Sequence, residues 1–125
     1  MKNAFIYFKN IQDITHSQKL EVFICDDFLS RLVGLMFKKE LDANQGAFFI
    51  NQQENRLDAS IHMLFMNFDI SVFWINSNNI IIDKIIAKKW RPIYIPRYNA
   101  KMILETHIDN YNKFDIGDRL IIENI

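Results

Sequence analysis

The chain has 125 residues, half of them hydrophobic, and its 15 basic and 15 acidic side chains cancel to a formal net charge of zero. This length corresponds to one domain, which we expect to span residues 1–125, and the balanced charge excludes a global field that would draw the chain to nucleic acid or a membrane surface. A lone cysteine, Cys25, excludes an internal disulfide framework, and no run of about twenty uncharged apolar residues is present. We therefore predict a cytoplasmic protein without membrane insertion.

Three short apolar runs in the first half of the chain predict strands. Residues 4–8 form a run that we expect at a sheet edge. Leu20–Cys25 alternates apolar and other side chains, and Gln45–Ile50 reads QGAFFI, with Gly46 near its start. Cys25 ends an apolar strand, so we expect it to be a small buried hydrophobe.

One helix is predicted between the second and third of these strands, over about residues 27–38. Leu29, Leu32, Val33 and Met36 recur there at helical spacing. Gly34 would cost such a helix about 1 kcal/mol relative to alanine, which close packing of the helix on a strand would offset.

The longest apolar stretch, residues 61–76, reads IHMLFMNFDISVFWIN. From Met66 onward its alternate residues predict the two faces of a central strand. One predicted face carries Phe68, Ile70, Val72 and Trp74; the other carries Asn67, Asp69, Ser71, Phe73 and Ile75.

The rest of the chain predicts further strands. Asn-rich residues 76–79 favour a turn, and the β-branched run 80–87 indicates a strand that returns along the central one. Met102–Thr106 and residues 119–123 predict two more strands, with a turn at Gly117. We expect a compact, mostly-β α+β domain: a sheet or partly closed barrel with one main helix packed on it.

His62 is the best placed of the three histidines for catalysis. A general base or metal ligand needs partners, and Asp69 and Glu105 are the carboxylate candidates. A straight strand would put Asp69 roughly 20 Å from His62. The structural alternative is a buried histidine bonded to a backbone carbonyl. Paired cysteines, His-x-His and a Gly-rich phosphate loop are all missing from the sequence, so we predict no metal site and no cofactor.

Basic and aromatic residues interleave between Lys84 and Lys101, and no acidic residue lies between these two lysines. Such a segment suits an anionic ligand or a single-stranded nucleic acid, although a solvated loop whose aromatics lie on the core has the same pattern. The ligand-binding candidates of this segment are Trp90, Arg91, Tyr94, Arg97 and Tyr98.

Successive blocks of the chain resemble the domain of unknown function 192 family. The blocks are RLVGLMFKK, GAFFI, SIHMLFMNFDISVFWIN, KKWRPIYIPRYNAKMILE and IGDRL, over about residues 31–120. The resemblance implies a compact, strand-dominated α+β domain and no established activity. It marks Arg31, Gly34, His62, Trp90, Arg91, Glu105, Gly117 and Asp118.

The chain departs from the family pattern at three positions. Asn67 replaces a basic residue, Asp69 a proline and Ser71 an aspartate. We interpret the pair usual at 67 and 71 as mainly structural. Restoring aspartate at Ser71 alone should then lower the melting temperature, because it would strand a charge.

The first interpretation of function is a non-enzymatic binding or accessory module for a small molecule or protein, using the 90–98 loop and the polar face of the central strand. The alternative is a small hydrolase or metal-dependent enzyme centred on His62 with Asp69 and Glu105. A third and weaker one is single-stranded nucleic-acid binding through residues 84–101. The apolar run 80–87 would favour a homo-oligomer if it lies at a sheet edge.

Overall fold

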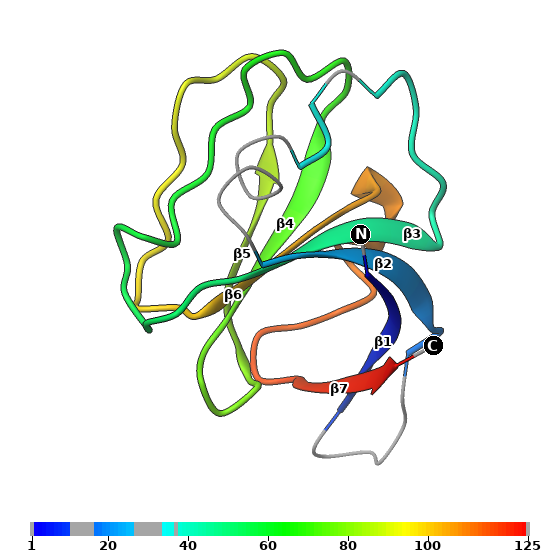
Figure 1. The fold of residues 1–125 in the computed structure, drawn as a ribbon, viewed down its shortest axis with the longest axis vertical. Coiled ribbons are helices and arrows are strands. Elements are labelled where there is room, and N and C mark those ends of the chain that lie inside the picture. Colours follow the sequence, from blue (N-terminus) through cyan, green and yellow to red (C-terminus); the bar gives the residue numbers. More distant parts are fainter. Residues whose placement is uncertain (1, 11–16, 27–33, 37, 125) are drawn as a thin grey trace.

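Seven strands form one sheet in the computed structural model, which describes residues 2–10, 17–26, 34–36 and 38–124 (Figure 1). The strands are β1 (Asn3–Lys9), β2 (Leu20–Cys25), β3 (Gln45–Ile50), β4 (Ile70–Ile75), β5 (Ile81–Ala87), β6 (Met102–Thr106) and β7 (Arg119–Asn124). A short 3-10 helix, η1 (Ile108–Asn110), follows β6. The strand order is β5-β4-β6-β3-β2-β1-β7, and every neighbouring pair is antiparallel except β2 and β3.

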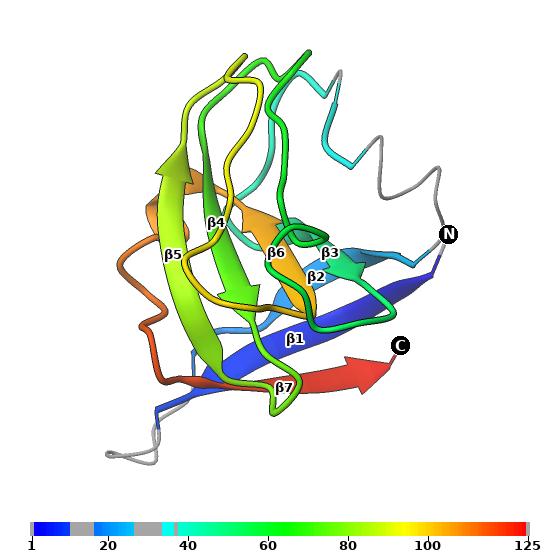
Figure 2. The same cartoon turned by 90° about the vertical axis from the view of Figure 1, so that its left-hand side faces the viewer.

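The sheet curls until its two edges meet at one end (Figures 1 and 2). Ile80, just before β5, forms an isolated bridge with Arg119 of β7. The backbone N–H of Ile81 donates to the carbonyl of Asp118 at 3.0 Å, and the N–H of Gly117 donates to the carbonyl of Ile81 at 2.9 Å. These contacts confirm the mostly-β, partly closed sheet predicted from the sequence.

Two apolar clusters pack on the two faces of this sheet. The first draws on both edge strands, with Ile81 from β5 and Leu120 from β7, so it fills the inside of the curl. The second covers the other face and includes Val72 and Trp74 of β4. Segments outside the strands complete the second cluster, for example at Ala59 and Ala100. The irregular segments that precede β4 and β6 therefore cover that face of the sheet.

The strand predictions are confirmed in their main features, with one correction of position. Leu20–Cys25, Gln45–Ile50 and Met102–Thr106 have the predicted bounds. The run 4–8 lies in a strand, but that strand is flanked by β2 and β7 and is not an edge. Cys25 is buried in the apolar cluster, as expected.

The helix predicted over about residues 27–38 is not supported. Residues 27–33 and 37 lie outside the described part of the chain, and residues 34–36 form a turn. Gly34 has φ +48°, in the left-handed region, so a right-handed helix cannot continue through it. Across the described residues, η1 is the only helical element, and none of those residues belongs to a helix long and apolar enough to cross a membrane.

The central strand is shorter than predicted. The alternation expected from Met66 begins only at Ile70, because the preceding residues turn and Phe65 has φ +61°. Within β4 the predicted faces are confirmed: Trp74 packs in one apolar cluster and Phe73 in the other. All six residues of β4 are buried. The segment before β4 therefore does not extend the strand, and some of its side chains line a cavity over the sheet instead.

Candidate functional site

A cavity of about 630 Å³ lies over the face of the sheet formed by β3 and β6. We call it the Glu105 pocket. Its apolar wall is made by Leu35, Phe49, Ile61, Met66 and Ile103, with Met36 at one end. Its polar wall is made by Asn51, Gln52, Gln53, Asp58 and Ser60, and Gly34, His62 and Glu105 complete the lining. This volume lies in the range of small-molecule sites, about 300–1,000 Å³.

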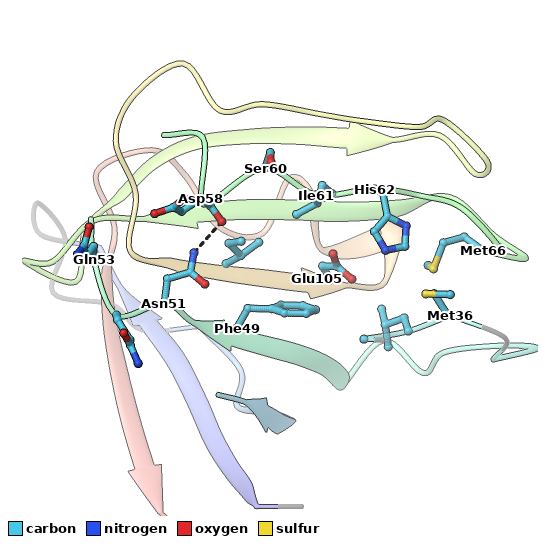
Figure 3. A pocket seen from close by; sticks show the side chains of 14 residues that line it. Met36, Phe49, Asn51, Gln53, Asp58, Ser60, Ile61, His62, Met66 and Glu105 are labelled. Atoms are coloured by element: carbon cyan, nitrogen blue, oxygen red, sulfur yellow. Dashed lines mark hydrogen bonds between the residues drawn. The ribbon is translucent and has the colours of Figure 1, made fainter. Parts of the chain in front are cut away.

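Glu105 lies in the middle of the pocket, on β6 (Figure 3). Its strand neighbours Leu104 and Thr106 point to the opposite side, whereas Ile103 shares its face and lines the same pocket. Register pairs Glu105 with Ala47 of β3 and Val72 of β4, both apolar, so no side chain directly opposite it can bind a carboxylate. The residue is 5% exposed.

The carboxyl of Glu105 forms no hydrogen bond or ion pair with any residue that the structure describes. Burial alone raises its pKa from 4.5 to about 8, because a charged carboxylate is poorly solvated there. The same residues contain no fully enclosed polar side-chain atom without a partner, so the carboxyl is not sealed in the core. It opens onto the pocket, protonated at neutral pH.

Gly34 lies against both Phe49 and Glu105 at the side of the pocket. A Cβ at position 34 would be 2.8 Å from Cζ of Phe49 and 3.7 Å from Oε1 of Glu105. The sequence predicts that a helix packs closely on a strand at Gly34; the helix is not supported, and it is a turn that brings Gly34 against Phe49 of β3. The left-handed turn at this position brings the backbone over the strand without a side chain in the way.

His62 enters the pocket lining from the segment before β4. Two short pairings hold this segment: Ile61 exchanges backbone hydrogen bonds with Tyr94 at 2.8 and 2.9 Å, and Met63 does so with Trp90 and Arg91, both at 2.8 Å. The Nδ1 atom of His62 accepts a hydrogen bond from the N–H of Leu64 at 3.2 Å. Figure 3 shows its ring and the Glu105 side chain directed into the same space.

The polar wall of the pocket is fixed by hydrogen bonds within and behind it. The side-chain amide of Asn51 donates to the carbonyl of Asp58 at 3.0 Å (Figure 3), and Ser60 Oγ donates to the carbonyl of Leu57 at 2.7 Å. Trp74 Nε1 on β4 donates to the carbonyl of Ala59 at 2.7 Å. The wall is therefore formed before any ligand arrives, which lowers the entropic cost of binding.

Asp69, the other predicted carboxylate partner of His62, lies outside the Glu105 pocket. It accepts a hydrogen bond from the N–H of Lys89 at 2.8 Å and lies 3.5 Å from Nζ of Lys88. The hydrogen bond from Lys89 lowers the pKa of the Asp69 carboxyl, because it favours the charged form. The structure brings His62 and Glu105 together and leaves Asp69 with the start of the 90–98 loop.

The 90–98 loop presents an exposed aromatic surface. Trp90 is 53% exposed and contacts Phe65 edge to face, with ring centroids 5.2 Å apart. Both residues have positive φ, +69° and +61°, although neither is glycine. Tyr98 is also exposed, and the guanidinium of Arg91 lies 5.9 Å from the ring centroid of Tyr94. None of these side chains lines the Glu105 pocket.

Several basic groups of the 84–101 segment already have partners in the protein. Arg97 forms an ion pair with the buried carboxylate of Asp83, with Nη2 at 3.0 Å and Nε at 3.2 Å from Oδ1. Lys84 Nζ donates to the carbonyls of Tyr111 and Phe114 at 2.8 and 3.1 Å and lies 3.4 Å from Asp115. These groups are less available to an anionic ligand than the sequence suggests.

Metal and cysteine chemistry receive little support from the arrangement. Among the described residues, no three His, Cys, Asp or Glu side chains converge as a metal site would require. Cys25 is buried, and its Sγ lies 3.8 Å from the carbonyl of Phe23. The carboxyl of Glu105 makes no hydrogen bond with His62, so these two do not form an assembled acid–base pair.

The sequence predicts Glu105 and His62 as candidate site residues, but its local patterns do not indicate the walls of their pocket. Asn51 and Ser60 belong to a stretch that reads only as a polar surface loop. Phe49 reads as an ordinary core residue of a strand. The useful signal was an acidic residue inside the apolar strand MILET, since a carboxylate in a buried strand requires a partner or a cavity.

Comparison with known proteins places this chain in a family. The family model DUF192, described as "Uncharacterized ACR", matches residues 10–122. A UPF0127 protein of Pyrococcus furiosus is 38% identical over 104 residues, which is 82% of this chain and 86% of that protein. One of Thermococcus gammatolerans is 37% identical over 97 residues, and the match spans 78% of this chain and 61% of that longer protein.

The fold is also present among solved structures. A proposed transcription regulator from Sinorhizobium meliloti superposes with a TM-score of 0.87 at 18% identity, over 96% of this chain and 93% of that one. At this level of identity the match shows the fold alone.

Proposed function

The chain belongs to the DUF192 family, and from this premise we propose that it is a binding module whose ligand site is the Glu105 pocket. One observation carries the proposal: a carboxyl buried on a central strand has no partner among the described residues and opens onto a preformed cavity. An unpaired buried polar group costs free energy, which a ligand that bonds to it recovers. The proposed ligand site is therefore the Glu105 pocket, whose lining contains no residue of the 90–98 loop predicted from the sequence.

The enzyme alternative pairs His62 with the carboxylates of Asp69 and Glu105, and the structure bonds neither of them to it. A general base requires an orienting partner within hydrogen-bond reach. Asp69 is bonded to Lys89 instead, and Glu105 is held protonated at neutral pH and makes no hydrogen bond with His62. The cavity and its buried carboxyl therefore support ligand binding more directly than hydrolysis at His62.

The test is a fragment screen followed by backbone-amide NMR, with a variant that fills the pocket. Ser60→Phe places a ring at the rim of the cavity, and Ser77→Phe in the exposed β4–β5 turn is the matched control. We expect fragments to shift signals of pocket residues in the wild type and in Ser77→Phe, and to lose affinity for a folded Ser60→Phe. Fragments that bind Ser60→Phe as well as they bind the wild type would contradict the proposal.

A second candidate site is the exposed surface of Trp90 and Phe65. Two non-glycine residues with positive φ hold an aromatic pair in solvent, and local strain of this kind is retained mainly at functional positions. The same screen, extended to sugars, nucleotides, peptides and short single-stranded oligonucleotides, tests this surface. Its ligands should lose affinity in Trp90→Ala and Arg91→Ala and keep it in Ser60→Phe. Unchanged binding after the two loop substitutions would remove this candidate.

A further inference from the structure

We infer that the Glu105 pocket selects a small amphiphilic ligand carrying a cationic amine, with the amine against the Glu105 carboxyl and an alkyl or similar apolar body against the Phe49 wall. This inference rests on the proposed binding function. It adds the chemical class of the ligand, and it follows from the charges, the apolar wall and the position of the carboxyl within the cavity.

The charged and titratable groups of the lining favour a cation. Within the described residues these groups are Glu105 from β6, Asp58 from the polar wall and His62 from the segment before β4. The remaining lining residues, from residues 34–36, β3, the segments between β3 and β4, and β6, are uncharged, and no lysine or arginine is present in this described lining. A negatively charged ligand would find two carboxyl groups there and no lysine or arginine among these residues to balance its charge.

The chemistry of a buried carboxyl makes the amine its natural partner. An ionised carboxylate only accepts hydrogen bonds, whereas an ammonium group only donates them, so the pair is complementary and charge-assisted. The free carboxyl holds a proton at neutral pH, because burial raises its pKa to about 8. When the ammonium group enters, that proton leaves to solvent and an ion pair replaces the neutral acid. Each amine bound therefore releases up to one proton below about pH 8.

The rest of the cavity suits an apolar body attached to that amine. The ring of Phe49 lies beside Glu105, and Met36 and Met66 lie together at one end of the pocket (Figure 3). Ile103, two residues before Glu105 on the same face of β6, adds to the apolar lining. Methionine side chains are unbranched and polarizable, so they adapt to alkyl groups of varied shape. Gln53 lies at the opposite end (Figure 3), where its amide can bond to a polar group on the far side of the ligand.

A matched series of three probes tests the charge preference: n-hexylamine, 1-hexanol and hexanoate, which share one alkyl chain. Backbone-amide NMR at about pH 8.5 should show the amine binding about tenfold more tightly than the alcohol, and hexanoate more weakly than both. Hexylamine stays charged throughout, since alkylamines titrate near the lysine value of about 10.4. Its affinity should fall by about tenfold per pH unit below pH 8, while the affinity of the alcohol stays constant.

Two variants assign the effect to one carboxyl. Glu105→Gln keeps the size of the side chain and removes its charge, so hexylamine should lose its advantage over hexanol and its pH dependence. Glu123→Gln on β7, where Glu123 pairs with Lys19 at 2.6 Å, is the control and should bind like the wild type. Melting temperatures confirm that both variants are folded.

The outcomes separate this inference from the function on which it rests. Hexanol that binds in the pocket as tightly as hexylamine, without pH dependence, would overturn the amine and leave the binding site standing. A preference for hexanoate would do the same. Failure of all three probes overturns the amine inference, whereas the binding function is removed by failure of the wider fragment screen or by fragments that bind Ser60→Phe as well as they bind the wild type.

Discussion

Glu105 is the residue from which the properties of the pocket follow. Its carboxyl is held on a strand between apolar neighbours, where an ionised side chain is poorly solvated and finds no cation among the described residues. Two other acidic residues of the chain, Asp83 and Asp69, have partners within the protein. Asp83 binds a guanidinium, and Asp69 accepts from a backbone N–H. The difference between these sites is the open cavity beside Glu105.

The raised pKa of Glu105 predicts that stability falls as pH rises. The folded state keeps this proton up to about pH 8, whereas the unfolded chain releases it near the ordinary value of 4.5. The contribution is complete below about pH 4.5 and is lost as pH rises through about 8, amounting to a few kcal/mol. Denaturant unfolding of the wild type and Glu105→Gln between about pH 5 and 9 measures it.

The wild type should lose stability relative to Glu105→Gln across that range, and Glu123→Gln should follow the wild type. A constant difference between the wild type and Glu105→Gln at every pH would contradict a buried, protonated carboxyl at this position.

Ser71 makes a second prediction at the residue scale. The family pattern predicts that aspartate at this position lowers the melting temperature, and the surroundings of the buried hydroxyl supply a reason. Ser71 Oγ donates to the carbonyls of His107 and Ile108 at 3.0 and 3.1 Å. An aspartate would set a carboxylate against two carbonyl oxygens, and we expect Ser71→Asp to cost about 2–4 kcal/mol of unfolding free energy.

Ser71→Asn is the matched control, because the asparagine side chain has nearly the same size as aspartate and its amide can donate to both carbonyls. Thermal unfolding should place the asparagine variant clearly above the aspartate variant. Equal melting temperatures would mean that size, and not charge, decides the effect, and a rise for Ser71→Asp would refute the prediction.

At the scale of elements, strands were predictable and the path of the chain between them was not. Alternation in Leu20–Cys25 and the apolar run Gln45–Ile50 record local burial, which the sequence carries directly. Residues 61–69 are just as apolar, yet they turn and pair with residues 90–94. That pairing joins segments far apart in sequence and fixes the place of His62, so no local pattern could reveal it.

Gly34 tests how residues 34–36 close the side of the pocket. Gly34→Ala places a methyl group 2.8 Å from Phe49 Cζ and requires alanine at φ +48°. We expect a loss of about 1–3 kcal/mol from both causes together. Phe49→Leu shortens the opposing side chain, so the double variant should lose less than the sum of the two single variants. Additive losses in chemical denaturation would show that Phe49 does not limit the space at Gly34.

Arg97 tests how the 90–98 loop is attached to β5. Its guanidinium is largely exposed, but the Asp83 side chain that it binds is 4% exposed. Arg97→Ala leaves a buried carboxylate that still accepts from the backbone N–H groups of Arg97 and Lys84, both at 2.9 Å. These remaining bonds reduce the cost below that of a fully stranded charge, and we expect about 1–3 kcal/mol.

Adding Asp83→Asn to Arg97→Ala should restore part of this stability, because the buried charge is then absent as well. Equilibrium unfolding of the two single variants and the double variant measures the coupling. A double variant that is less stable than either single variant would argue against an attachment through charge.

At the scale of the whole molecule, one curled sheet serves two purposes. The inside of the curl is filled by an apolar cluster that holds the edges together, and the outer face carries the loops that build the pocket. The blocks that resembled the DUF192 family predicted the strand-dominated fold, and the family match confirms the relationship. β5 lies at an edge of the sheet, as a homo-oligomer formed through residues 80–87 would require, and self-association stays a prediction. A cytoplasmic location and nucleic-acid binding also stay predictions.

The most direct measurement of the central claim is a titration of the Glu105 side chain itself, by the carbon NMR signal of its carboxyl group. In the free protein the account predicts a midpoint near the raised pKa of about 8, moving downward when hexylamine is added. A midpoint at the ordinary value of 4.5, unchanged by the amine, would show that this carboxyl is solvated or already paired, and would contradict the account.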